Sequence, residues 1–196
     1  MLDKLDLVMG GRWDWLHYQV KDAFKTDGNQ SGSRTVAQAS GSIGLVYHLT
    51  EQQQIYTHVA SVFEAPTTTE LLNNPAGRGG FNPRLNAQTS LSNELGIRGN
   101  TAGFQYDTAV FFIRTWDEIT PFELPSSPGR AFFRNAGQSR RIGVETRLAT
   151  PEWKGLRGEV SYTFSDFEFE KYAVNNVNLK GNVFPGIPAH RWERLV

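Results

Sequence analysis

Apolar and polar side chains alternate one by one along most of the chain, in segments separated by turn and loop sequences. In the first segment, odd positions such as Leu7 and Trp13 are apolar, whereas even positions such as Asp6 and Arg12 are charged. A period of two residues is typical of a β-strand that buries one face. We expect eight such strands, at about 5–20, 38–49, 54–63, 89–98, 104–120, 132–149, 156–172 and from 187.

The connections between the predicted strands alternate between long and short. The long ones are rich in Gly, Pro, Asn and Ser, and they cover 21–37, 64–88, 121–131 and 173–186. Transmembrane β-barrels combine long outer loops with short periplasmic turns in this way. We therefore expect one continuous antiparallel sheet, curved like a barrel wall, with the long loops at one end and the short turns at the other.

The alternation also predicts which side chains share a face. One face should carry Leu91, Leu95, Ile97, Ile142, Val144, Leu148, Val160, Tyr162 and Phe164. The other should carry Glu94, Arg98, Arg141, Glu145, Arg147, Arg157 and Glu159. In a wide barrel the charged face would line a watery lumen. In a soluble β-sandwich it would be ordinary solvent surface, and the period alone does not separate the two folds.

Composition excludes several classes of function. The 196 residues include 20 basic and 20 acidic side chains, so the chain lacks the basic excess of a nucleic-acid binder. Cysteine is absent, which removes disulfides, thiolate metal sites and cysteine nucleophiles. The longest apolar run covers 109–113, whereas a membrane helix needs roughly 20 apolar residues. No signal-peptide pattern follows Met1, which indicates either a cytosolic protein or an internal piece of a longer chain.

No motif for catalysis or metal binding emerges from the sequence. The four histidines show no HExxH or other metal-ligand spacing, and no G-x-S-x-G string is present. The glycines at 77–80 lack the strand–loop–helix context of a phosphate loop. We expect neither an enzyme, nor a metal site, nor a resident cofactor.

Five strings follow one another in the order and spacing of a known family. They are FEAPTTTEL (63–71), NPRLNAQTSLSNELGIRG (82–99), AVFFIRTWDEI (109–119), FFRNAGQSRRIGVET (132–146) and GNVFPGIPAHR (181–191). Each string is weak alone, but together they resemble the β-barrel domain of TonB-dependent outer-membrane receptors, of the siderophore-receptor type. The resemblance covers most of residues 41–191 and favours the barrel over the sandwich.

The resemblance implies a fold and a mechanism. Receptors of this family have a presumed 22-stranded barrel that encloses an N-terminal plug. They bind a scarce nutrient, usually a ferric siderophore, and TonB moves the plug to admit it. Residues 1–196 resemble a middle or C-terminal part of the barrel, about eight strands, without plug, TonB box or signal peptide. The implied partners are a small-molecule ligand, TonB through the absent plug, and outer-membrane lipid of a Gram-negative bacterium.

Two of the long connections contain candidate ligand-binding residues. Arg78, Phe81 and Arg84 lie in 64–88, and Arg130 and Arg134 lie in or beside 121–131. Basic and aromatic side chains in an outer loop suit an anionic, catechol-like or carboxylate chelate. The alternative for each is a solvated loop residue. The ligand could also be cobalamin, copper or haem, and a soluble all-β binding module is the alternative of another class.

Some residues of the predicted wall are expected to have structural roles. Glu94 and Glu145 should pair with lumen arginines and hold the wall. Gly96, Gly137 and Gly143 should permit close backbone approach or bulges in their strands.

Overall fold

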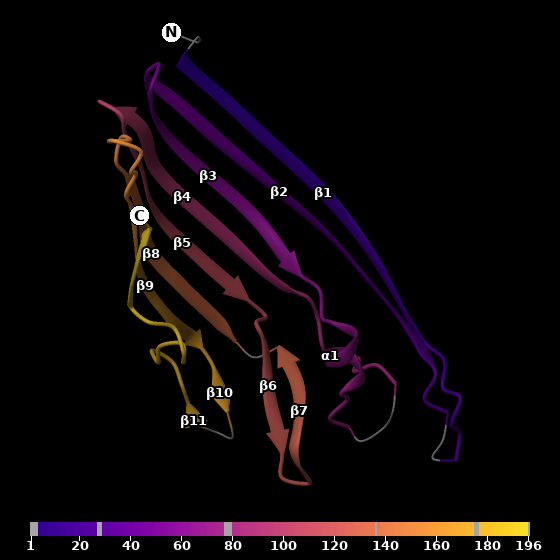
Figure 1. The fold of residues 1–196 in the computed structure, drawn as a ribbon. Helices are drawn as coiled ribbons and strands as arrows, with labels where there is room; N and C mark the ends of the chain where they lie inside the picture. The colour runs from indigo at the N-terminus through magenta and orange to yellow at the C-terminus, as the bar shows by residue number, and fades with distance from the viewer. Residues whose placement is uncertain (1–3, 27–28, 77–79, 136, 175–176, 196) are drawn as a thin grey trace.

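Eight strands form one antiparallel sheet in the computed structural model, which describes residues 4–26, 29–76, 80–135, 137–174 and 177–195 (Figure 1). In spatial order they are β1 (Leu5–Val20), β2 (Gly32–Thr50), β3 (Gln53–Glu64), β4 (Gln88–Thr101), β5 (Phe104–Trp116), β8 (Gln138–Ala149), β9 (Glu159–Lys171) and β12 (His190–Leu195). The predicted continuous sheet, with sequential strands as neighbours, is confirmed. Among the described residues, no helix is long and apolar enough to cross a membrane.

Three small elements lie in the long connections. They are helix α1 (Thr68–Leu72), the hairpin of β6 (Ile119–Leu124) and β7 (Ser127–Asn135), and the hairpin of β10 (Ala173–Val174) and β11 (Val177–Asn178). The β6–β7 hairpin differs from the prediction, which ran two long strands through these residues and placed a loop at 121–131. Asp117 and Gly137 have φ angles of 54° and 116°, so extended pairing stops on both sides of the hairpin base.

The pairing register confirms the two predicted faces. Val144 lies between Val110 of β5 and Phe164 of β9, and these three share the apolar face. On the other face, Glu145 lies between Ala109 and Thr163. The remaining predicted members follow the same alternation. Arg157 precedes β9, and its guanidinium donates a hydrogen bond of 2.6 Å to Gln105, which lies on the charged face.

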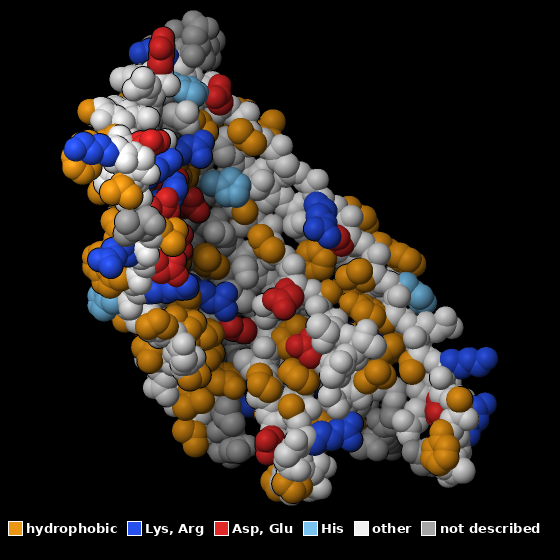
Figure 2. All heavy atoms as spheres, viewed as in Figure 1, with side chains coloured by type: hydrophobic (Ala, Val, Ile, Leu, Met, Phe, Trp, Pro, Cys, Tyr) orange, Lys and Arg blue, Asp and Glu red, His pale blue; other side chains and the backbone are white. Residues whose placement is uncertain are grey.

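The charged face is the hollow one, and the apolar face is uncovered. Figure 2 shows Arg, Asp, Glu and His side chains gathered along the concave side of the sheet. On the opposite face, Met9 is 70% exposed, Trp13 68% and Leu95 53%. Since no second sheet packs on these apolar side chains in the described part of the chain, the arrangement is not a sandwich with a dry core. It is an open section of barrel wall.

The connections are sorted by length between the two ends of the sheet. Because the strands are antiparallel neighbours, the connections after β1, β3, β5 and β9 lie at one end, and those after β2, β4 and β8 at the other (Figure 1). The first group contains the four long connections, as predicted, but β2 begins at Gly32, so residues 32–37 of the predicted 21–37 loop belong to a strand. We call this end the loop end and the opposite one the turn end.

Two glycines accommodate aromatic rings on the concave face, as expected for close approach. A Cβ added at Gly143 would lie 2.3 Å from Phe111 Cζ and 2.5 Å from the carbonyl oxygen of Phe164. At Gly96 it would lie 2.3 Å from the ring of Tyr56. An aromatic side chain packed over a strand glycine pins the register of neighbouring strands.

Gly143→Ala should therefore destabilise the assembled barrel. The new methyl group would collide with the Phe164 carbonyl, which cannot rotate away, so we expect a loss of about 1–3 kcal/mol. Denaturant unfolding in lipid vesicles measures this loss. Gly44→Ala is the matched control, because Gly44 lies on the interior strand β2 and an added Cβ there would make only ordinary contacts, the nearest at 3.4 Å. Equal stability of the two variants would contradict the close approach.

Candidate ligand-binding rim

The connection between β3 and β4, residues 65–87, folds into a small ordered unit at the loop end. Thr67 caps α1, because its side chain accepts a hydrogen bond from the Glu70 backbone while the Glu70 carboxylate accepts one from the Thr67 backbone. Such a capping box satisfies backbone donors at the start of a helix. Leu71 and Leu85 are fully buried, which gives this loop a core of its own.

The 65–87 loop leans towards the concave side of β1 and β2. Tyr18 and Arg34 are cross-strand partners on the concave face. The Tyr18 hydroxyl donates to the carbonyl of Pro66 at 3.0 Å, and Arg34 donates to the carbonyl of Asn82. Phe81 sets its ring edge-on against Tyr18, with 6.3 Å between ring centroids. The loop is thus placed beside the mouth of the hollow.

The same loop is joined to the β6–β7 hairpin through asparagines. The Asn86 backbone donates to Asn135 Oδ1 at 2.6 Å, and Asn135 Nδ2 returns a hydrogen bond of 2.9 Å to the Asn86 carbonyl. The Asn82 side chain donates to the carbonyl of Phe133 at 3.3 Å. Two connections that are far apart in sequence therefore form one rim.

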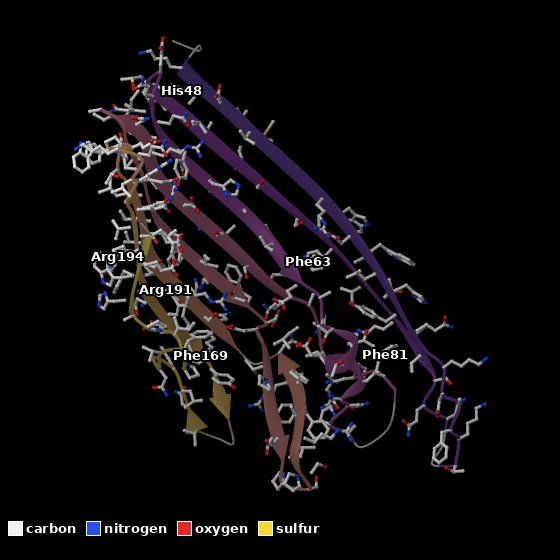
Figure 3. All side chains as sticks on the ribbon, viewed as in Figure 1. His48, Phe63, Phe81, Phe169, Arg191 and Arg194 are labelled. Carbon is white, nitrogen blue, oxygen red and sulfur yellow. The ribbon has the colours of Figure 1, made fainter. Side chains whose placement is uncertain are left out.

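The five predicted ligand-binding residues have different surroundings. Arg78 lies outside the described residues. Phe81 is half-buried against Tyr18, and it lies at the loop end, as Phe169 does, whereas His48 lies at the turn end (Figure 3). The Arg84 side chain is exposed and forms no hydrogen bond or ion pair with any described residue; only its backbone N–H is bonded, to Asn82 Oδ1.

Arg130 and Arg134, on the β6–β7 hairpin, are held by rings of the hairpin and by hydrogen bonds to neighbouring connections. Arg130 donates to Asn73 at 3.2 Å and lies 5.0 Å over the ring of Phe132. Arg134 donates to the carbonyl of Ala173 at 2.8 Å and lies 4.9 Å over the ring of Phe122. The structure brings Phe81 and Arg84 together on one loop, and places Arg130 and Arg134 on the neighbouring hairpin.

An aromatic cluster lines the concave face near the loop end, and sequence reasoning missed it. Phe184, from the connection after β9, stacks on Phe169 with 4.3 Å between centroids. Phe167 lies edge-on to both Phe184 and Phe111, with centroids 6.5 and 6.3 Å away. Arg141 lies 5.3 Å over the ring of Phe184. Rings and a guanidinium in a concave wall can bind aromatic or anionic groups.

The polarity of the two faces is reversed near the loop end. In β9 the apolar face carries Phe164 and then Asp166 and Glu168, while Phe167 and Phe169 turn to the concave face. The signal is visible in the sequence as a change in the phase of the alternation. It means that the apolar band of the outer face ends within β9.

The reversed segment carries ion pairs on its outer face. Arg114 pairs with Glu170 at 2.7 Å, and Arg140 pairs with Glu168 at 2.9 Å and Asp166 at 3.4 Å. Arg114 and Arg140 are themselves cross-strand partners. We call these five residues the outer ion-pair cluster.

Towards the turn end, the concave wall has an acidic hollow of about 350 Å³, which Glu94, Asp107 and Glu145 help to line. The expectation that Glu94 and Glu145 pair with lumen arginines is not met, because neither carboxylate forms an ion pair with a described arginine. Arg147 instead makes two hydrogen bonds of 2.6 Å to Glu159. Within the described ranges, no three His, Asp or Glu side chains lie close enough to share a metal ion.

Comparisons with known proteins agree with this geometry. The family model described as TonB dependent receptor-like, beta-barrel, matches residues 1–193. Among solved structures, the ferric yersiniabactin uptake receptor FyuA from Yersinia pestis has a TM-score of 0.70 and 23% identity, over 98% of this chain and 28% of that one. The siderophore receptor PiuA from Acinetobacter baumannii has a TM-score of 0.73 and 18% identity, over 97% and 28%.

A copper transporter, OprC, is also similar in fold. It has a TM-score of 0.69 and 18% identity, over 86% of this chain and 26% of its own. The chain thus spans just over a quarter of the length of these proteins. At these identities the structural likeness establishes the fold and not the cargo.

Proposed function

Because the chain belongs to the family of TonB-dependent receptor-like β-barrels, we propose that it forms part of the wall of a receptor that takes up a scarce nutrient across a Gram-negative outer membrane. Proteins of this family are transporters, and the expectation that the chain is not an enzyme is confirmed. The observation that carries the proposal is the wall itself. It has an uncovered apolar outer face, a charged hollow inner face and four long connections at one end.

The proposed cargo is a ferric siderophore, moved by the TonB system through a plug inside the barrel. Arg84 supports this cargo, because its exposed guanidinium is unpaired within the described part and lies close in sequence to the ring of Phe81. A cation and an aromatic ring at the mouth of the hollow suit an anionic, aromatic chelate. PiuA, whose fold is similar, is a siderophore receptor, and FyuA is an uptake receptor for ferric yersiniabactin. A copper complex is the second candidate, favoured by the similar fold of OprC.

Replacing Arg84 by alanine in the assembled barrel should weaken binding and uptake of an anionic ferric siderophore by about tenfold or more, because one hydrogen bond to a charged group is worth roughly 1.5–3 kcal/mol. Cell uptake of radioactive iron supplied as a catecholate or carboxylate siderophore measures the change. A copper complex offered in parallel tests the second candidate.

Arg157→Ala is the matched control, since Arg157 lies at the turn end, where no ligand is expected to bind. If barrels with Arg84→Ala and barrels with Arg157→Ala take up iron equally well, Arg84 is not part of the ligand site. If neither iron nor copper complexes are taken up by the unaltered barrel, the proposed cargo is wrong.

A further inference from the structure

A basic groove opens at the rim, between the base of the β6–β7 hairpin and the β10–β11 hairpin. Its volume is about 450 Å³. Three cationic side chains line it, namely Arg134, Lys171 and Lys180, together with Glu170, Tyr172 and Asn178. We call it the rim groove. The uptake proposal assigns no role to it.

The rim groove has an excess of positive charge. Its one carboxylate, Glu170, is already paired with Arg114 at 2.7 Å. The ammonium groups of Lys171 and Lys180 are on exposed residues, and they form no ion pair or hydrogen bond with the residues that the structure describes. Three positive charges around one neutralised carboxylate make a site that attracts an anion.

Arg134 is held in place for such an anion. One end of its guanidinium donates to the carbonyl of Ala173, and its plane lies over Phe122, so the side chain is fixed. Its Nη1 forms no hydrogen bond with the described residues and is not among the buried atoms, so its N–H groups remain free to donate to an anion in the groove. A planar guanidinium with a free N–H suits a tetrahedral oxyanion, because it can donate two parallel hydrogen bonds to it.

The groove lies at the outer edge of the lipid head-group layer, if the barrel has the proposed outer-membrane location. Glu170 pairs with Arg114, which lies on the outer face, so one wall of the groove belongs to that face. Lys171 is the cross-strand partner of Gln138, which lies four residues along β8 from the apolar Ile142. Four residues are about 13 Å along a strand, or about 9 Å in height at a tilt of about 45°. The polar head-group layer is roughly 5–8 Å thick on each side.

We propose that the rim groove binds a phosphate ester. Arg134 supplies the fixed fork of donors, and Lys171 and Lys180 close on the remaining oxygens. The same chemistry would bind the head group of an anionic lipid in the outer leaflet or a soluble phosphate ester. At the outer edge of the head-group layer the groove is open to either source, and the test below separates them.

The test uses the assembled barrel that contains residues 1–196, purified in zwitterionic detergent. Short-chain phosphatidic acid is the lipid probe, phosphatidylcholine the neutral comparison, and glycerol phosphate the soluble probe. Native mass spectrometry counts retained lipid, and titration calorimetry gives the affinity for glycerol phosphate. Lys171→Gln combined with Lys180→Gln removes two charges without removing a described contact. Lys21→Gln combined with Lys25→Gln removes two exposed charges from the connection after β1, at the opposite edge of the loop end.

The Lys171/Lys180 variant should bind phosphatidic acid about 30-fold more weakly, since each basic residue near a charged lipid surface contributes roughly 1 kcal/mol. The Lys21/Lys25 variant should stay within about twofold, and added salt should weaken binding to the unaltered protein. Arginine in place of both lysines should restore it. If the Lys171/Lys180 variant loses binding of phosphatidic acid alone, the groove is a lipid site. If it loses binding of glycerol phosphate alone, the ligand is soluble.

Equal retention of phosphatidic acid and equal affinity for glycerol phosphate in both double variants would overturn the proposal. So would binding that does not respond to salt. The proposal that the rim groove binds a phosphate ester does not depend on the proposed outer-membrane location. Only a lipid as the source of that phosphate ester does. Uptake of iron by the Arg84 variants is measured separately, so either proposal can fail without the other.

Discussion

An arginine in place of Val144 is expected to cost the assembled barrel about 2–4 kcal/mol of unfolding free energy in lipid. Val144 lies in the middle of the apolar band, with Val110 on one side and Phe164 on the other. A guanidinium there would face hydrocarbon, and its direct cross-strand partners, Val110 and Phe164, have side chains that accept no hydrogen bond. Reversible unfolding by guanidinium chloride in phospholipid vesicles measures the loss.

Thr163→Arg is the control at the same height. Thr163 lies on the concave face opposite Glu145, whose carboxylate has no ion pair with the described residues. The same guanidinium would meet water and a free carboxylate there, so the free energy of unfolding should change by less than about 1 kcal/mol. A loss at Val144 no larger than that at Thr163 would show that the apolar face does not contact lipid.

The strands and their faces could be predicted because the information is local. In β8, Ile142, Val144 and Leu148 alternate with Arg141, Glu145 and Arg147, and one wrong step in register would exchange the two sets. In a wide sheet with one apolar face, the apolar set can leave water only if all of its members lie on that face. The order of the strands followed from the same local signal, because short turns join neighbours.

The β6–β7 hairpin and the reversal of polarity in β9 were harder to predict. The hairpin depends on the left-handed backbone at Asp117 and on Gly137, where an added Cβ would lie 1.6 Å from the carbonyl oxygen of Lys171. Both residue types are common at turns, but Asp14 and Gly143 lie inside strands of the same sheet, so residue type alone does not mark the break. In β9, Asp166 and Glu168 alternate with Phe167 and Phe169, which signals that the faces exchange polarity, but a period of two continues through the exchange.

The rim could be predicted only in part, because it is built from contacts between distant residues. Arg34 and Asn82 are separated by 48 positions, and Asn86 and Asn135 by 49. No local pattern relates such pairs. Residue type identified Arg84 as a candidate, and its side chain, which has no partner among the described residues, keeps it one. The same reasoning could not show that Arg130 is held by Asn73.

The 196 residues by themselves are expected neither to fold stably in a membrane nor to transport. Among the described residues, β1 pairs only with β2 and β12 only with β9, so the sheet has two open edges. Along the 16 residues of β1, every second residue presents its N–H and C=O at the edge. Each unsatisfied group costs several kcal/mol in lipid, and in water such edges promote aggregation. The described residues supply wall and rim, and none of them forms a plug on which TonB could pull.

The eight strands could avoid unpaired edge groups if β1 paired with β12 and closed a small eight-stranded barrel. It is disfavoured because β12 has six residues against the sixteen of β1, and because the narrow lumen would crowd Glu94, Asp107 and Glu145 together. Production of residues 1–196 alone in an outer membrane, beside the same residues in a completed barrel, tests this directly. We expect protease-sensitive material without a heat-dependent shift in gel mobility. A protease-resistant, heat-modifiable monomer would show that eight strands suffice, and nutrient uptake by it would overturn the mechanism.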